Sequence, residues 1–154
     1  MKKKDIEKFI TERLEKLKND PIHKKWCTIN DKAVNNYSLL SDNERVCFSL
    51  RLLIDAVSNG GIVGFYCNHS GEKMSEVLYD LEVAGCFDVV KRLAELNGFF
   101  PNSIVPKDIN ERNKCMEMWN KKQDEALENF DEWFYSISDK LEEKYKELIL
   151  AEIH

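Results

Sequence analysis

The stretch Ser58–Gly71, SNGGIVGFYCNHSG, decides how the chain is expected to turn. An apolar run at residues 46–57 precedes it and predicts a largely buried helix, which begins at a capping box at Ser41–Glu44. Apolar residues at helical spacing follow it over residues 74–84, and Gly85 closes this second pattern. Glycines and asparagines between two helical patterns predict a helix–turn–helix corner at residues 58–71.

The residues inside this corner fit the prediction. Asn59–Gly61 can end the first helix, because glycine adopts the left-handed conformation of a helix end at little cost. Ile62, Phe65 and Tyr66 fall at positions i, i+3 and i+4, so one short helical turn brings their side chains to the core. The segment Asn68–Gly71 can then cap the next helix, since Asn and Ser side chains bond readily to nearby backbone groups.

The spacing in the corner argues against phosphate binding and against catalysis. A Walker A loop needs GxxxxGK[ST], whereas Gly71 is followed by Glu72, and the dinucleotide pattern GxGxxG is absent. His69 lies two residues from Cys67, but residues so close in a turn rarely point at one another, and no orienting acid is evident. We therefore expect no catalytic residue, no enzymatic activity and no cofactor.

The remaining segments also indicate helices. Apolar periodicity predicts helices at residues 5–18, 87–97, 108–135 and 139–152, with a proline-broken loop between 99 and 108 and a kink or restart at 136–139. Residues 19–40 are expected to be irregular, with Trp26 and Tyr37 as anchors on the core. Since no strand pair or internal repeat stands out, residues 1–154 are expected to form one all-α domain, a bundle of about six to eight helices.

Composition limits the compartment and the metal chemistry. No run approaches the ~18 apolar residues of a membrane span. The start, MKKKDIEKF, lacks the apolar stretch of a signal peptide. The five cysteines are an odd number without a CxxC pair, so neither a disulfide framework nor a zinc site is supported. We therefore expect a cytoplasmic protein without a metal.

One face of the predicted helix at residues 108–135 is strongly acidic. On a helical wheel its apolar residues occupy one arc, and a row of carboxylates, interrupted by Lys121 and Lys114, lies opposite. We call this row the acidic face: Glu117, Asp124, Glu125, Glu128, Asp131 and Glu132. Carboxylates three or four residues apart repel each other, so helix stability alone would favour alternating charges. The face is either an ordinary solvated surface or a strip that docks on a basic protein.

The run at residues 56–85, AVSNGGIVGFYCNHSGEKMSEVLYDLEVAG, resembles the hallmark of a bacterial family of unknown function, the DNA-mimic-protein-like domain. The residues that match, and that are candidates for shaping the fold or lining a pocket, are Asn59, Gly60, Gly61, Phe65, Tyr66, Asn68, Ser70 and Gly71, together with Gly85. The resemblance extends more weakly over residues 40–149, so 40–150 is the expected family-like core and 1–35 a less family-like segment. Ala56 and Gly64 depart from the acidic residue and the glutamine common in the family, which alters any pocket lined by those side chains.

The resemblance implies an all-helical cytoplasmic protein that occupies the DNA-binding surface of a regulator. With a net charge of −5, we expect a non-enzymatic protein that uses the acidic face on a basic partner, mimicking DNA towards a DNA-binding protein, without touching nucleic acid or a membrane itself. Two alternatives are an immunity protein against a toxin, and a small-ligand sensor or enzyme with a pocket near Asn59 and Asn68. The apolar side of the N-terminal helix is compatible with a homodimer.

Overall fold

A computed structural model describes residues 3–153 of the chain, and within this range it contains α-helices and short 3-10 helices but no strand. The seven α-helices are α1 (Lys3–Asn19), α2 (Pro21–Asn36), α3 (Asp42–Cys67), α4 (Met74–Val83), α5 (Phe87–Asn97), α6 (Ile109–Glu117) and α7 (Lys121–Ala151). The 3-10 helices are η1 (Tyr37–Leu39), η2 (His69–Lys73) and η3 (Pro101–Ser103). The prediction of a single all-α domain is therefore confirmed.

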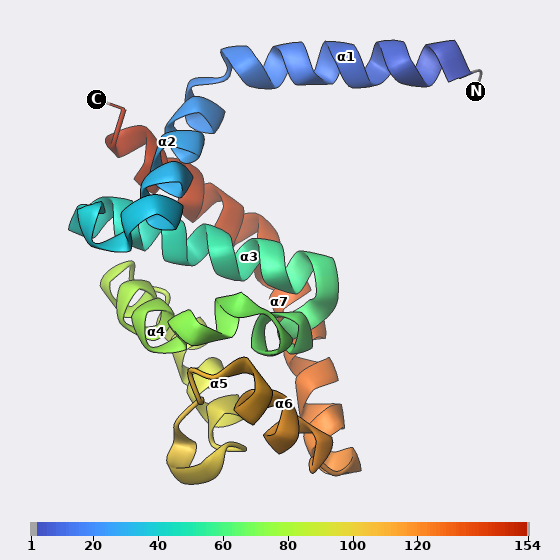
Figure 1. Cartoon of the computed structure of the whole chain (residues 1–154), viewed down its shortest axis with the longest axis vertical. Coiled ribbons are helices and arrows are strands. Elements are labelled where there is room, and N and C mark those ends of the chain that lie inside the picture. Colours follow the sequence, from blue (N-terminus) through green and yellow to red (C-terminus); the bar gives the residue numbers. More distant parts are fainter. Residues whose placement is uncertain (1–2, 154) are drawn as a thin grey trace.

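The two longest helices, α3 and α7, organise the core. In Figure 1, α7 crosses behind α3 at an angle and extends past it, with α2 on one side of α3 and α4, α5 and α6 on the other. Apolar side chains from these helices form one buried cluster, which includes Leu50, Leu53, Leu81, Leu93 and Phe134. Every helix except α1 places at least one fully buried residue inside the fold.

The capping box predicted at the start of α3 is present. The Glu44 N–H donates to Ser41 Oγ at 3.2 Å, and the Ser41 N–H donates to Glu44 Oε2 at 3.1 Å. By length and composition α3 could also cross a membrane, but half of its most apolar window is buried inside the fold. Its apolar character follows from its position between α4 and α7, as in the core helix of a globular domain.

The prediction of an irregular segment at residues 19–40 is wrong. Residues 21–36 form α2, whose first residue is Pro21 and whose N-cap is Asp20, with the Ile22 N–H donating to the Asp20 carboxylate at 2.9 Å. Proline is favoured at the first position of a helix, so Pro21 both ends α1 and starts α2. The two predicted anchors do pack on the core, since Trp26 stacks on Phe48.

The predicted helix at residues 108–135 is also wrong, because the chain breaks at residues 118–120. Asn120 and Gln123 form a capping box that starts a new helix there. From this start α7 continues to Ala151 without the kink predicted at residues 136–139. The hydroxyls of Ser136 and Ser138 donate to carbonyls of the preceding turn, so both serines are accommodated inside a regular helix.

Helix α1 projects from the rest of the molecule (Figure 1). Its main contact among the described elements is with α2, and none of its described residues is buried. Four apolar side chains on it are largely exposed: Ile6, Phe9, Ile10 and Leu14. The described chain therefore leaves most of the apolar side of this helix uncovered.

Candidate functional site

The corner begins with a kink inside α3, where Gly60 and Gly61 leave the helical conformation. Gly61 has φ +66° and ψ −177°, a conformation that L side chains rarely adopt. A Cβ at Gly61 would also lie 2.3 Å from the Asp131 carboxylate of α7. That carboxylate accepts the Ile62 N–H at 2.8 Å, so Asp131 caps the helical segment that follows the kink.

The corner ends with side-chain caps on two of the last carbonyls of α3. The Asn68 amide donates to Gly64 O at 2.7 Å, and the Ser70 hydroxyl donates to Phe65 O at 2.9 Å. These two carbonyls would otherwise have no partner, because the last turn of a helix lacks the N–H groups that continue it. Asn68 and Ser70 therefore cap the end of the preceding helix. The prediction that this segment caps the next helix is wrong, because neither η2 nor α4 begins with a side-chain cap.

Arg112 of α6 completes this end of the helix from the opposite side. It is fully buried, and its guanidinium donates only to backbone carbonyls. Nε donates to Tyr66 O and Nη2 to Asn68 O, both at 2.8 Å. Nη1 donates to Pro106 O at 2.8 Å and to Lys107 O at 2.7 Å. A cation at the C-terminus of a helix is favoured by the helix dipole, and here it also ties the loop before α6 to α3.

Gly71 provides the space for this guanidinium. A Cβ at Gly71 would lie 2.5 Å from Arg112 Nε and 2.8 Å from Cζ. The final glycine of the corner is therefore needed for a close side-chain approach, with no positive φ involved. Sequence reasoning missed Arg112, because an arginine in a charged helical segment looks like any exposed residue of that type.

Phe65 and Tyr66 pin the corner to the core as predicted. Both are fully buried, and the Tyr66 hydroxyl donates to Asn97 Oδ1 at 2.6 Å. The Tyr66 ring packs edge-on against Phe100 and Trp119, with centroids 5.1 Å and 6.2 Å away. In contrast, Asn59 and His69 are exposed. The polar groups of the corner shape the backbone and do not converge on a common point.

The members of the acidic face lie on two helices. Glu117 is the last residue of α6, and the other five lie in the first half of α7. Asp131 is partly buried, and burial raises the pKa of its carboxyl, with a further contribution from Glu128, although the Ile62 hydrogen bond opposes the shift. Glu125 pairs with Lys121 at 3.8 Å on the surface. Within residues 3–153, no ion pair engages the remaining members: Glu117, Asp124, Glu128 and Glu132.

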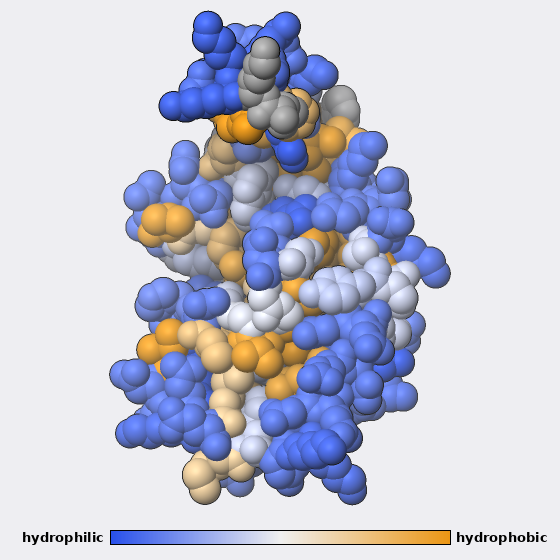
Figure 2. Space-filling view, turned by 90° about the vertical axis from the view of Figure 1, so that its right-hand side faces the viewer, coloured by the Kyte–Doolittle hydropathy of each residue, from blue (hydrophilic) through white to orange (hydrophobic). Residues whose placement is uncertain are grey.

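The end of α6, the start of α7 and the segment of α3 after the kink enclose a hollow of about 430 Å³. We call it the acidic groove, and it is lined by Val63, Cys67, Asn113, Met116, Glu117, Trp119, Asp124 and Leu127. Figure 2 views the side of the molecule on which α3 turns and α7 begins, and shows a hydrophobic area surrounded by hydrophilic residues. The break before α7 thus places Glu117 and Asp124 at one groove, and not on one continuous helix.

Two residues that line the acidic groove have unsatisfied polar atoms. Asn113 Oδ1 and Trp119 Nε1 are buried, and neither has a hydrogen-bond partner within the described chain. Such groups are rare in folded proteins, and each leaves a desolvation cost that a ligand or a bound water can relieve.

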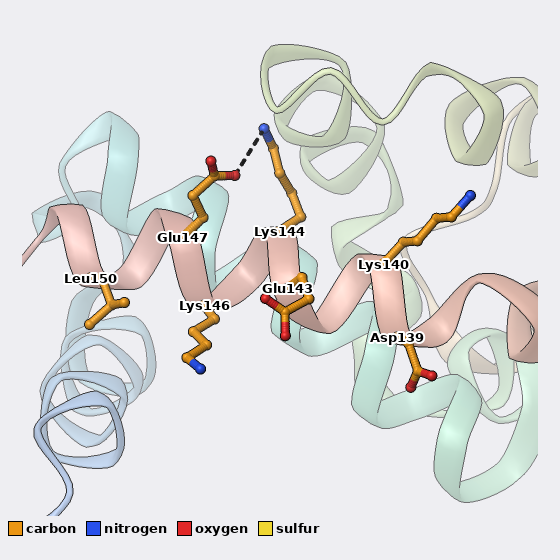
Figure 3. Close-up of a pocket in the computed structure, with 7 residues that line it drawn as sticks. All are labelled: Asp139, Lys140, Glu143, Lys144, Lys146, Glu147 and Leu150. Atoms are coloured by element: carbon orange, nitrogen blue, oxygen red, sulfur yellow. Dashed lines mark ion pairs between the residues drawn. The ribbon is translucent and has the colours of Figure 1, made fainter.

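A larger hollow of about 650 Å³ lies along the second half of α7. Figure 3 shows that all of its lining residues come from this one helix, with Lys140, Lys144 and Glu147 on one side and Asp139, Glu143 and Lys146 on the other. Lys144 and Glu147 pair at 3.8 Å. This hollow is an open ledge with mixed charges, and it lacks groups that converge on a ligand.

The described residues offer no cluster suited to a metal or to thiol chemistry. No group of three or more His, Cys, Asp or Glu side chains within residues 3–153 is placed to hold a metal ion. All five cysteines are free. Burial raises the pKa of the Cys47 thiol to about 12, and it also raises the pKa values of Cys67 and Cys86. These three thiols are therefore protonated and poor nucleophiles near neutral pH.

The family model of the DMP19-like proteins matches residues 38–152. The chain belongs to the DMP19-like family. A search of curated proteins and a search of solved structures returned no match. The DMP19-like segment begins at η1 and contains the corner, Arg112 and the whole acidic face, whereas α1 and α2 precede it. The corner and the acidic face thus both lie in the part of the chain that matches the family.

Proposed function

We propose that this DMP19-like protein is a non-enzymatic interaction protein, which places its acidic face on a basic surface of another protein in the cytoplasm. We further propose that this basic surface normally holds DNA, so that the chain and DNA compete for it. The family resemblance to DNA-mimic proteins motivates the second part. The first part rests on the charges of the face itself.

The observation that carries the proposal is the set of carboxylates without counter-charges. Asp124 lies in the first turn of α7, where the positive end of the helix dipole stabilises it. Glu125 is outside this set, because it pairs with Lys121. The dipole does not explain Glu117, which is the last residue of α6, where a negative charge is disfavoured. Glu128 and Glu132 are four residues apart on one helix, which costs a few tenths of a kcal/mol in repulsion. A basic partner would offset both the unfavourable position of Glu117 and the repulsion between Glu128 and Glu132.

The distribution of charge along the chain supports a directed interaction. Residues 117–152 hold eleven Asp and Glu against five Lys, a local charge of −6, while residues 1–32 hold ten Lys and Arg against six acidic residues. A field of this kind steers a basic partner towards α7 and away from α1. On α7, carboxylates three or four residues apart are ~5–6 Å from each other. This spacing imitates only coarsely the phosphate charges that recur every ~3.4 Å along a DNA strand.

A non-enzymatic role agrees with the use of polar groups in the corner. The side chains of Asn68 and Ser70 are occupied by α3 carbonyls, and His69 is exposed on the surface. The hollow that the corner lines involves Val63 and Cys67. An immunity protein would use the same acidic face on a basic toxin, so the identity of the captured partner decides between a regulator and a toxin.

Affinity capture with a matched pair of variants tests the proposal. We expect the intact protein to retain a basic protein from cytoplasmic extract of its source, with elution by salt because exposed charges are screened. The variant Glu125→Lys, Glu128→Lys, Glu132→Lys should lose this protein. The control Glu82→Lys, Glu95→Lys, Glu143→Lys changes three exposed carboxylates elsewhere and should keep it. Identical capture by both variants would overturn the proposal.

A further inference from the structure

We propose that the acidic groove is a socket for one arginine side chain of the basic partner. This inference rests on the proposed function and adds the chemical group that the acidic face recognises. The groove meets three requirements for such a group: an apolar wall for the methylenes, two lining carboxylates, and enclosed polar atoms without partners on two further lining residues.

The wall of the groove suits the stem of a long side chain. Val63 is 39% exposed, and Met116 and Leu127 pack against the core from α6 and α7. Arginine buries its methylenes on apolar surface while its charged head stays near water. Methionine adapts its shape to the group that it contacts, which favours a flexible guest.

The carboxylates of the groove suit the head of the side chain. Glu117 comes from the end of α6 and Asp124 from the first turn of α7, so the groove is flanked by negative charge from two helices. Neither is in an ion pair within the described residues. A guanidinium has five donors in a planar fork and binds two acceptors at once, whereas a lysine ammonium is a compact and strongly hydrated charge. An anionic guest, such as a phosphate, would be repelled.

The unsatisfied atoms at the wall extend this match. Asn113 Oδ1 is an enclosed acceptor without a partner, and a guanidinium would donate to it once the side chains around it shift. Trp119 Nε1 is an enclosed donor without a partner, and after the same shift a main-chain carbonyl beside the arginine would accept from it. An apolar guest would leave both atoms and both carboxylates unpaired, so it would bind less well.

Proton–nitrogen NMR on the full-length protein tests the socket with defined probes. The probes are three short glycine-flanked peptides, which carry one arginine, one lysine or one citrulline at the same position. We expect the arginine peptide to shift the Trp119 indole N–H and the Asn113 amide signals. The lysine peptide should bind more weakly, and the uncharged citrulline peptide should cause no shift. Equal binding of the lysine and arginine peptides, or shifts elsewhere on the surface, would overturn the inference.

A matched pair of variants separates the groove from the general field of the face. Glu117→Gln with Asp124→Asn removes the two groove carboxylates, and we expect about a tenfold or greater loss of affinity for the arginine peptide. Glu125→Gln with Glu132→Gln removes the same charge outside the groove and should change the affinity less than about threefold. All four residues are exposed, so both variants should fold. Equal losses in the two variants would show a diffuse attraction and contradict the socket.

The two proposals fail in different ways. If the groove variant holds the captured partner as tightly as the intact protein while reversal of Glu125, Glu128 and Glu132 releases it, the socket is wrong and the acidic face stands. If the arginine peptide binds in the groove but reversal of the face leaves capture unchanged, the proposed function is wrong and the chemical specificity of the groove stands.

Discussion

A single buried arginine holds together three separate parts of the chain. Arg112 joins the last turn of α3, the turn at Asn68 and the loop before α6, and no carboxylate pairs with it within the described residues. Burying an arginine in this way is costly unless its donors find acceptors. Here the four carbonyl contacts and the helix dipole together supply this compensation.

The closest test at this scale is a pair of glycine substitutions. Gly71→Ala should lower the free energy of unfolding by about 2–3 kcal/mol, because the new Cβ overlaps a guanidinium that has no room to move. Gly64→Ala should be neutral or stabilising by up to about 1 kcal/mol, since its Cβ meets only Ala56 O at 3.6 Å and alanine favours a helix. Urea denaturation measures both, and a harmless Gly71→Ala would contradict the role given to Arg112.

Asp131 provides a pH-dependent test of the kink. In the folded protein the pKa of the Asp131 carboxyl lies above its ordinary value. The folded state therefore binds the carboxyl proton more tightly than the unfolded state does, and ionisation of Asp131 lowers the stability of the fold at higher pH. Asp131→Asn keeps an acceptor for the Ile62 N–H without the charge, and should be as stable as the natural protein or more so at pH 7. Its advantage should shrink as the pH falls through the raised pKa.

Asp131→Ala is the matched comparison, since it removes the acceptor altogether. It should lose about 1 kcal/mol at neutral pH, the usual cost of a missing helix cap. If the Asn and Ala variants were equally stable in thermal melts at pH 7, the hydrogen bond from Ile62 would be irrelevant to the kink.

Sequence reasoning succeeds for local caps and fails for distant ones. The capping box of Ser41 and Glu44 spans three residues and has a sequence signature, so the sequence predicts it correctly. Asn68 and Ser70 are expected to cap the next helix, but their bonds reach four or five residues back to α3. Arg112 and Asp131 reach backbone groups 44 and 69 residues away, respectively, at Asn68 and Ile62. Pairings over such distances depend on how helices dock, which the periodicity of one segment does not contain.

At the scale of the elements, α2 shows how one buried carboxylate positions a helix. Glu44 of α3 accepts from Lys32 Nζ at 2.8 Å and from Lys25 Nζ at 3.3 Å, and it also caps α3 through the Ser41 N–H. Burial favours a higher pKa for this carboxyl, but these hydrogen bonds and charges together lower it below 4.5. Because the pKa of Glu44 is lower in the folded state, its ionised carboxylate stabilises the fold at pH values above the unfolded pKa. This stabilisation is lost as the pH falls through the folded-state pKa.

Glu44→Gln should therefore lower the free energy of unfolding by about 2 kcal/mol at pH 7, since two charge-assisted bonds are weakened in a buried place. The difference from the natural protein should shrink below about pH 4.5, where the unfolded chain takes up a proton. Denaturant titrations of both proteins between pH 3 and pH 7 measure this difference in the free energy of unfolding. Asp42→Asn is the control, because Asp42 is exposed and its effect should stay below about 0.5 kcal/mol.

The break between α6 and α7 matters more for function than any other departure from the predicted elements. A continuous helix at residues 108–135 would have placed Glu117 and Asp124 seven residues apart on one surface. The capping box at Asn120 turns the chain instead, and both residues line the acidic groove. The capping pattern Asn-x-x-Gln is visible in the sequence, but the apolar periodicity on both sides of it hides the break.

At the scale of the whole molecule, α1 stands apart from the domain. Since none of its described residues is buried, removal of residues 1–19 should change the free energy of unfolding by less than about 0.5 kcal/mol. Asp20 remains in this variant as the N-cap of α2. Removal of residues 1–36 also deletes the buried Ile29 and both lysines on Glu44, and it should destabilise the fold strongly.

The same truncation tests the role of the apolar side of α1. The homodimer that this side is compatible with stays a prediction, and sedimentation velocity on the intact and shortened proteins checks it. A dimer that persists after removal of residues 1–19 would contradict a role for α1 in self-association.

Competition with DNA tests the central claim most directly. The captured basic partner would be bound to labelled duplex DNA, and fluorescence anisotropy would be followed as the intact protein is added. We predict that the anisotropy falls to the value of free DNA, that Glu125→Lys, Glu128→Lys, Glu132→Lys abolishes the effect, and that the control Glu82→Lys, Glu95→Lys, Glu143→Lys keeps it. Anisotropy that rises, as a complex of all three forms, or equal displacement by both variants would contradict the account.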